Sequence, residues 1–133
     1  MSQKNLDVVR GLYEEGLFEN DPQALLAFAH DDIQFVNPHD AVEPGMRSGR
    51  DEFLGALTSG LAPFRSATHE LLDLFDAGES VVAAVRFRAR GRDSGIELVQ
   101  DEAHTWTFRD GKVVCFECGR DLDAALEAAG QAS

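Results

Sequence analysis

The chain has 133 residues, of which 44% are hydrophobic and 27% are charged, values typical of one globular domain with its own core. Its 24 acidic residues outnumber the 12 basic ones, giving a net charge of −12. A surface this acidic repels nucleic acid and anionic membranes, which excludes both as partners. The sequence shows no signal-like N-terminus and no apolar run that could span a bilayer. We therefore expect a single cytoplasmic domain, residues 1–133.

The first third of the chain predicts two helices and a short strand. Apolar residues at helical spacing indicate a helix over about residues 5–17, with Tyr13 on its buried side. Asp21 followed by proline is a typical helix start and predicts a second helix over residues 22–29. The apolar period then changes to two, which predicts a strand over residues 31–37 that a proline ends.

Residues 38–49 are expected to form a loop, because they contain two prolines and two glycines. Long loops of this kind carry function or cover a site, so the segment is a candidate lid, and His39 within it is a candidate ligand contact. Ser48 is expected to cap a third helix over residues 49–57, whose apolar side includes Phe53.

The second half of the chain predicts an antiparallel meander of four strands, at residues 68–75, 80–90, 96–108 and 113–119. In the second strand, alternation places Phe87 on one face and a row of arginines on the other. We expect the arginine row on the outer face, either solvated or paired with a second subunit. Asp121 is expected to cap a closing helix over residues 122–129.

The last hairpin carries the residues with the most chemistry. His104, Trp106 and Phe108 share one face of the strand. A three-residue loop, residues 109–111, would place Phe108 opposite Lys112. That register brings four further side chains to the face of His104: Val114, Phe116, Cys118 and Arg120.

Two or three helices followed by a curved antiparallel sheet predict an α+β domain, in which the N-terminal helices cover the concave face and enclose a pocket. Three segments match a known pattern: A-H-D-D-I-Q-F-V-N-P at 29–38, G-R-D-E-F-L at 49–54, and W-T-F-R-D-G-K-V-V at 106–114. The chain resembles the nuclear-transport-factor-2-like superfamily, which includes ketosteroid isomerase, limonene epoxide hydrolase and SnoaL-like polyketide cyclases. Asp121-Leu122 before an alanine-rich helix is similar to the SnoaL-like subgroup.

The resemblance also indicates which activities the chain lacks residues for. Tyr13 matches the tyrosine donor of ketosteroid isomerase, whereas Asn37 stands at the position of its aspartate base and His104 at its second donor. An amide does not accept a proton at neutral pH. In the epoxide hydrolases the last strand carries an aspartate, and Cys118 stands there.

The remaining expectation is cofactor-free proton transfer beside a carbonyl group, of the isomerase or polyketide-cyclase type, on an apolar, ring-bearing small molecule. His104 is the expected acid/base, because imidazole titrates near neutrality. Tyr13 and Asn37 are expected to polarise the carbonyl oxygen. The expected substrate-binding residues are Trp106, Phe116, Phe87, Phe53, Glu102, Arg120, Cys118 and His39. Glu102 or Arg120 would hold the imidazole or bind an acidic group of the substrate.

Other interpretations of the same residues stay open. The domain can be a binding module without chemistry, or a structural dimer with a filled interior, and His104 can be a satisfied core residue. We expect no cofactor and no metal, because no ligand spacing supports His39 or His69 as partners of His104 in a metal site. We also expect a homodimer that forms through the outer face of the sheet.

Overall fold

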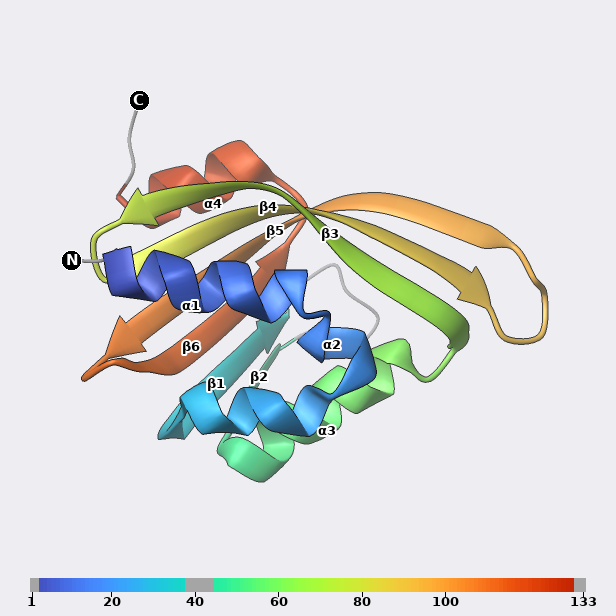
Figure 1. Cartoon of the computed structure of the whole chain (residues 1–133), viewed down its shortest axis with the longest axis horizontal. Helices are drawn as coiled ribbons and strands as arrows, with labels where there is room; N and C mark the ends of the chain where they lie inside the picture. The colour runs from blue at the N-terminus through green and yellow to red at the C-terminus, as the bar shows by residue number, and fades with distance from the viewer. Residues whose placement is uncertain (1–2, 38–44, 131–133) are drawn as a thin grey trace.

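The computed structural model describes residues 3–37 and 45–130 (Figure 1). It is an α+β structure, as predicted, and the elements follow in chain order: α1 (Gln3–Glu14), α2 (Leu17–Asn20), the 3-10 helix η1 (Pro22–Phe28), β1 (Ala29–Asn37), β2 (Gly45–Ser48), α3 (Arg50–Leu61), β3 (Phe64–Ala77), β4 (Ser80–Gly91), β5 (Glu97–Arg109), β6 (Lys112–Gly119) and α4 (Leu122–Ala128). None of the described helices is long and apolar enough to cross a membrane.

All six strands form one curved sheet in the order β2-β1-β6-β5-β4-β3. Among the strand pairs of the described residues, only β1 with β6 is parallel, and the β3–β6 meander is antiparallel throughout. The register of β3 shifts between Leu71 and Asp73, and an extra residue of this kind bends a strand. The long strands β3, β4 and β5 bend near the middle of their length and extend beyond the end of α1 (Figure 1).

The helices are divided between the two faces of the sheet. α1 contacts β3 and β4 and crosses one face, while α4 contacts β4 and β5 from the other side (Figure 1). Side chains therefore alternate between two environments along β5. His104 and Trp106 point to the α1 side, and Thr105 and Thr107 point to α4.

The core lies between the sheet and the α1–α3 layer. It is made of side chains that are almost fully buried, and its aromatic members touch one another around Phe116, at ring-centroid distances of 4.5 Å to Trp106 and 5.8 Å to Phe18. The apolar residues of the core with at most 3% exposure include Val9, Leu12, Phe18, Leu25, Ile33, Phe53, Val81, Val85, Trp106, Val113 and Phe116.

Several predicted boundaries are wrong for local reasons. The first helix ends early because Gly16 adopts a left-handed conformation (φ 63°), which starts α2 separately. Ser48 does not cap α3, since it pairs with Gln34 as part of β2, and Gly49 precedes the helix without a side-chain cap. β2 thus occupies the end of the predicted loop. His39 and the rest of the candidate lid lie outside the described residues.

The hairpin between β5 and β6 turns more tightly than predicted. Arg109 pairs with Lys112, and both turn residues have positive φ, 55° at Asp110 and 79° at Gly111, as in a two-residue type I′ turn. A bulge follows, so Val113 rather than Val114 lies inside. Beyond the bulge the register differs from the prediction by two residues, which keeps every side chain on its predicted face.

The predicted arginine row lies along the outer side of β4. Arg86 forms an ion pair with Asp101 of β5 at 2.8 Å, and Arg90 donates a hydrogen bond to the carbonyl of Gly95 at 2.7 Å. Two of the three arginines are therefore paired within the chain. Asp121 caps α4 as predicted, because its side chain accepts a hydrogen bond from the amide of Ala124.

Candidate active site

A cavity of about 390 Å³ opens between α3, α2 and the concave face of the sheet. It lies on the α1 side, where the inward-pointing residues of β3, β4, β5 and β6 meet. The predicted site residues that line it are Asn37, Phe87, Glu102, His104, Phe116, Cys118 and Arg120. The cavity wall is aromatic, and β5 contributes Gln100, Glu102 and His104 to its polar lining.

Three predicted site residues do not line this cavity. Tyr13, Trp106 and Phe53 are 5%, 1% and 1% exposed and belong to the core cluster. Tyr13 lies behind His104 and contacts its imidazole, and Trp106 contacts the Tyr13 hydroxyl in turn. Their contribution to the site is therefore made through His104.

A continuous chain of hydrogen bonds runs from the core to the cavity. Trp106 Nε1 lies 3.0 Å from the Tyr13 hydroxyl, which lies 2.6 Å from His104 Nδ1. His104 Nε2 in turn lies 2.8 Å from Glu102 Oε1. Gln100 Nε2 completes the chain at 2.7 Å from Glu102 Oε2.

The chemistry of the two ends fixes the direction of the bonds there. An indole N–H can only donate and a carboxylate can only accept, so the Tyr13 oxygen accepts from Trp106 and the Nε2–H of His104 donates to Glu102. With a neutral imidazole, the Tyr13 hydrogen goes to His104 Nδ1. Neither ring nitrogen of His104 is left over for a ligand.

Burial supports this assignment of charge. Burial lowers the pKa of His104 below its ordinary value of 6.5, against the opposing effect of Glu102. For Glu102, burial acts to raise the pKa, but the hydrogen bonds from His104 and Gln100 and the nearby imidazoles outweigh it, and the pKa lies below 4.5. Burial also raises the pKa of Tyr13 well above 10.0. The resting site holds an ionised carboxylate, a neutral imidazole and a neutral phenol.

These shifts predict that acid destabilises the fold in two steps. Below about pH 6.5 residue 104 is protonated in the unfolded chain but stays neutral in the folded chain. The free energy of unfolding therefore falls as pH falls, by up to about 1.4 kcal/mol per pH unit from this proton. Below about pH 4.5 the unfolded chain also protonates Glu102 before the folded chain does, which removes further stability.

The measurement is urea unfolding followed by circular dichroism between pH 7.5 and pH 5. His104→Gln is the matched variant, because glutamine keeps a donor toward Glu102 and does not titrate. The free energy of unfolding of this variant is expected to fall less steeply over that range than that of the wild type. Equal slopes would contradict the buried neutral imidazole.

A second histidine–carboxylate pair borders the same cavity. His69 of β3 lines it, and its Nδ1 lies 2.9 Å from Oε1 of Glu19 in α2. The imidazole packs between Phe18 and Phe87, at ring-centroid distances of 4.8 and 4.9 Å. The His69 and His104 rings are 6.0 Å apart, so both pairs face one small volume.

Glu19, Gln100 and His69 were not predicted as residues of the pocket. His69 could have been found, because it pairs with Phe87 across β3 and β4 and so shares its inward face. Glu19 carries no such signal, since it lies in a short helix 50 residues away from its partner.

Glu102, His104 and Cys118 are also the described residues that come closest to a metal-ligand set, with ligand atoms within 4.8 Å of one another. A metal ion here would have to break the His104–Glu102 hydrogen bond. It would also have to ionise a thiol whose pKa burial raises to about 12, with Glu102 adding to the effect. The hydrogen bonds of the described residues account for these groups without an ion.

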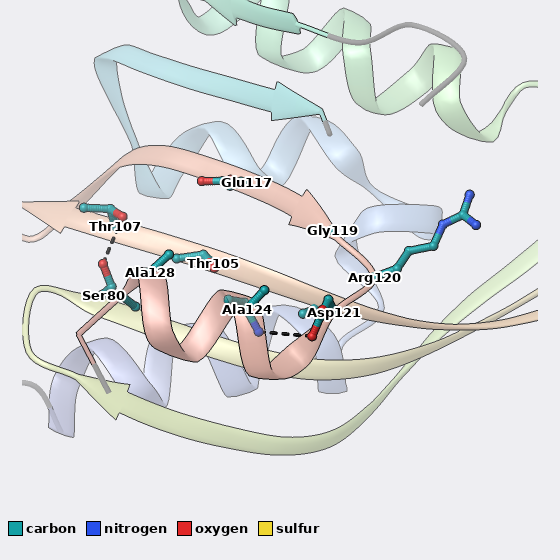
Figure 2. A pocket seen from close by; sticks show the side chains of 12 residues that line it. Ser80, Thr105, Thr107, Glu117, Gly119, Arg120, Asp121, Ala124 and Ala128 are labelled. Atoms are coloured by element: carbon teal, nitrogen blue, oxygen red, sulfur yellow. Dashed lines mark hydrogen bonds between the residues drawn. The ribbon is translucent and has the colours of Figure 1, made fainter. Parts of the chain in front are cut away.

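A second hollow, of about 520 Å³, lies on the opposite face of the sheet beneath α4 (Figure 2). Small side chains border it on both sides, among them Ala124 and Ala128 of the helix and Thr105 of β5. Ser80 and Thr107 bond to each other across its floor at 3.0 Å. It contains neither histidine–carboxylate pair.

Three solved structures resemble this fold over nearly their whole lengths. An NTF2-like protein of unknown function from Burkholderia pseudomallei is 22% identical with a TM-score of 0.78, covering 96% of this chain and 97% of its own. TerC, co-crystallised with polyporic acid, is 21% identical with a TM-score of 0.76, covering 96% and 99%. A Jannaschia sp. protein provisionally named a SnoaL-like polyketide cyclase is 16% identical with a TM-score of 0.78, covering 98% and 94%.

These identities show a shared fold only. No curated protein matches the chain. The family model of the SnoaL-like domain, however, matches residues 9–116, a segment that runs from α1 through most of β6 and includes both histidine–carboxylate pairs. The chain therefore belongs to the family of SnoaL-like domains, with an NTF2-like fold.

Proposed function

We propose that the protein is a cofactor-free acid–base enzyme of the isomerase or cyclase type, which moves a proton beside a carbonyl group of an apolar small molecule. The observation that carries the proposal is the Glu102 carboxylate in the wall of an aromatic cavity. Its side chain is 11% exposed, and it is held in place by His104 and Gln100. A carboxylate of this kind is a general base already in its working protonation state.

The proton acceptor that faces the ligand is Glu102 rather than His104. Both nitrogens of His104 are engaged within the protein, by Tyr13 and by Glu102. Glu102 Oε1 accepts from His104 and, at 3.9 Å, from Cys118 Sγ, whereas Oε2 accepts only from Gln100 among the described residues and has capacity for a second bond. His104 is then a positioning residue that orients the carboxylate, and Tyr13 orients His104 in turn. Asn37, at the end of β1, lines the cavity and is placed to polarise the substrate oxygen with its amide.

The cavity wall favours a flat, apolar ligand. Phe18, Phe35, Phe87 and Phe116 all line it, and aromatic rings bind ring-bearing ligands by stacking and edge contacts. Arg120, at the edge, can pair with an acidic group. The names of two structural neighbours, a polyketide cyclase and TerC with polyporic acid, support a ring-bearing organic acid or ketone as the substrate class. A homodimer through the outer sheet face remains part of the proposal.

The test uses 5-nitrobenzisoxazole, which loses a carbon-bound proton to a base as its N–O bond breaks and releases a coloured phenolate. We expect the wild type to catalyse this elimination and Glu102→Gln to lower kcat/KM by about 100-fold, the typical contribution of a general base. Glu117→Gln is the matched control, because Glu117 is exposed and points to the opposite face. Undiminished turnover by Glu102→Gln would refute Glu102 as the base.

The alternative function is a binding module without chemistry. It is favoured by the complete internal pairing of the Trp106–Tyr13–His104–Glu102 chain, which is as suitable for a rigid pocket as for a catalyst. Binding of the benzisoxazole without turnover, seen as quenched Trp106 fluorescence, would support this alternative.

A further inference from the structure

His69 and Glu19 form a histidine–carboxylate pair that the proposed mechanism does not yet use. Their side chains are 9% and 14% exposed, and the 2.9 Å contact joins His69 Nδ1 to the carboxylate. Phe18 and Phe87 hold the ring on either side.

The orientation of this imidazole differs from that of His104. Nδ1 of His69 is turned toward Glu19, which leaves Nε2 on the other edge of the ring. The described residues offer Nε2 no hydrogen-bond partner. Among those residues, no fully buried side-chain nitrogen or oxygen lacks a partner. Nε2 of His69 is therefore accessible, and the hollow that His69 lines is the cavity of Glu102. A carboxylate that holds Nδ1–H and leaves Nε2 for the reactant is the arrangement of a catalytic dyad.

We propose that His69, held by Glu19, is the general acid of this site and acts on the substrate oxygen while Glu102 acts on carbon. The inference deepens the proposed function and depends on it. It specifies the substrate as a cyclic ketone whose oxygen lies toward β3 and whose acidic C–H bond lies toward β5.

The step balances without a co-reactant. The C–H bond breaks and its proton passes to Glu102, while the electron pair forms the carbon–carbon double bond of an enol. The carbonyl π pair moves to oxygen, which takes the proton from Nε2 of the protonated imidazole. His69 is left neutral, with Nδ1–H still on Glu19. In the reverse sense, Glu102 returns its proton to a different carbon of the enol, and the enol oxygen returns its proton to Nε2 of His69. The net result is isomerisation.

The experiment measures stabilisation of an oxyanion rather than turnover. The probe is 4-nitrophenol, whose ionised form alone absorbs visible light, and nitrobenzene is its neutral analogue. In the wild type we expect the cavity to favour bound nitrophenolate. His69→Asn keeps a donor near Nδ1 but has nothing at Nε2, so its affinity for nitrophenolate is expected to fall at least about tenfold, with nitrobenzene affinity unchanged.

A second variant separates the proposed role from a structural one. His69→Gln places an amide donor near Nε2 and is expected to retain more nitrophenolate affinity than His69→Asn. Unchanged nitrobenzene binding and an unchanged melting temperature confirm that each variant keeps its cavity. If His69→Asn binds nitrophenolate as the wild type does, or if the two variants lose it equally, His69 is not the oxygen-directed donor.

The outcome is independent of the test of Glu102. Glu102→Gln removes a negative charge from the cavity, so its nitrophenolate affinity is expected to be equal to or higher than that of the wild type. Loss of benzisoxazole turnover in Glu102→Gln together with full nitrophenolate binding in His69→Asn would overturn the inference about His69 alone. Wild-type turnover by Glu102→Gln, together with weak nitrophenolate binding in His69→Asn, would instead refute the base and leave His69 as an oxygen-directed donor.

Discussion

Replacing Trp106 with alanine is expected to destabilise the fold by about 3–5 kcal/mol, the usual cost of truncating a buried aromatic residue to alanine. Trp106 is 1% exposed and is among the largest fully buried side chains described. Its ring contacts Phe116 at 4.5 Å, Phe18 at 5.7 Å and Tyr13 at 6.2 Å between centroids. Removing it opens a cavity in the centre of the aromatic cluster and also deletes the donor to Tyr13.

The measurement is the free energy of unfolding in urea, followed by far-ultraviolet circular dichroism. Trp106→Phe retains most of the ring volume and loses only the N–H group, so it is expected to lose distinctly less stability. Ile96→Ala is the exposed control, since Ile96 is 71% exposed and such substitutions usually stay within about 0.5 kcal/mol. A loss of less than about 1 kcal/mol in Trp106→Ala would contradict the packing described around this residue.

Trp106 also shows how far periodicity could predict the site. Alternation along residues 102–108 correctly indicated that His104 and Trp106 share the inner face, because the strand period is two whatever the neighbouring elements do. Alternation carries no information on depth, however. Whether an inward side chain reaches a cavity or is covered depends on the helix above it, and α1 covers Trp106 while leaving Glu102 beside the hollow.

Glu102 was predicted as one of two residues that could hold the imidazole, and it does bond to His104. Which of the two residues faces a ligand as the base depends on a contact that no local pattern contains. The proton on His104 is determined by Tyr13, 91 residues away in sequence. The second dyad likewise joins residues 50 apart. The register of the last hairpin was missed for a local reason: Asp110 adopts a left-handed conformation, which turns the chain in two residues and moves the irregularity into a bulge at Val114.

Replacing Tyr13 with phenylalanine is expected to lower the free energy of unfolding markedly, although the change removes only one oxygen atom. The hydroxyl accepts from Trp106 and donates to His104. Without it, two nitrogens on residues that are 1% and 2% exposed lose their partners, and each unpaired buried group costs about 1–3 kcal/mol. The Tyr13 hydroxyl can donate to Nδ1 only when Nδ1 is unprotonated, so this bond stabilises the neutral imidazole. Without it the pKa of His104 is expected to rise relative to the wild type.

The free energy of unfolding of Tyr13→Phe measures the first effect, and a histidine NMR titration measures the second. His104→Gln provides the matched background, because glutamine keeps a donor near Nε2 for Glu102 and has no acceptor at the position of Nδ1. In that background Tyr13→Phe should lower the free energy of unfolding by a smaller amount, since only the Trp106 N–H loses its partner. The difference between the two backgrounds is the coupling energy between the Tyr13 hydroxyl and the His104 imidazole. Equal costs in the two backgrounds would show that the Tyr13 hydroxyl does not determine the protonation of His104, and the directional chain from Trp106 to Glu102 would have to be abandoned.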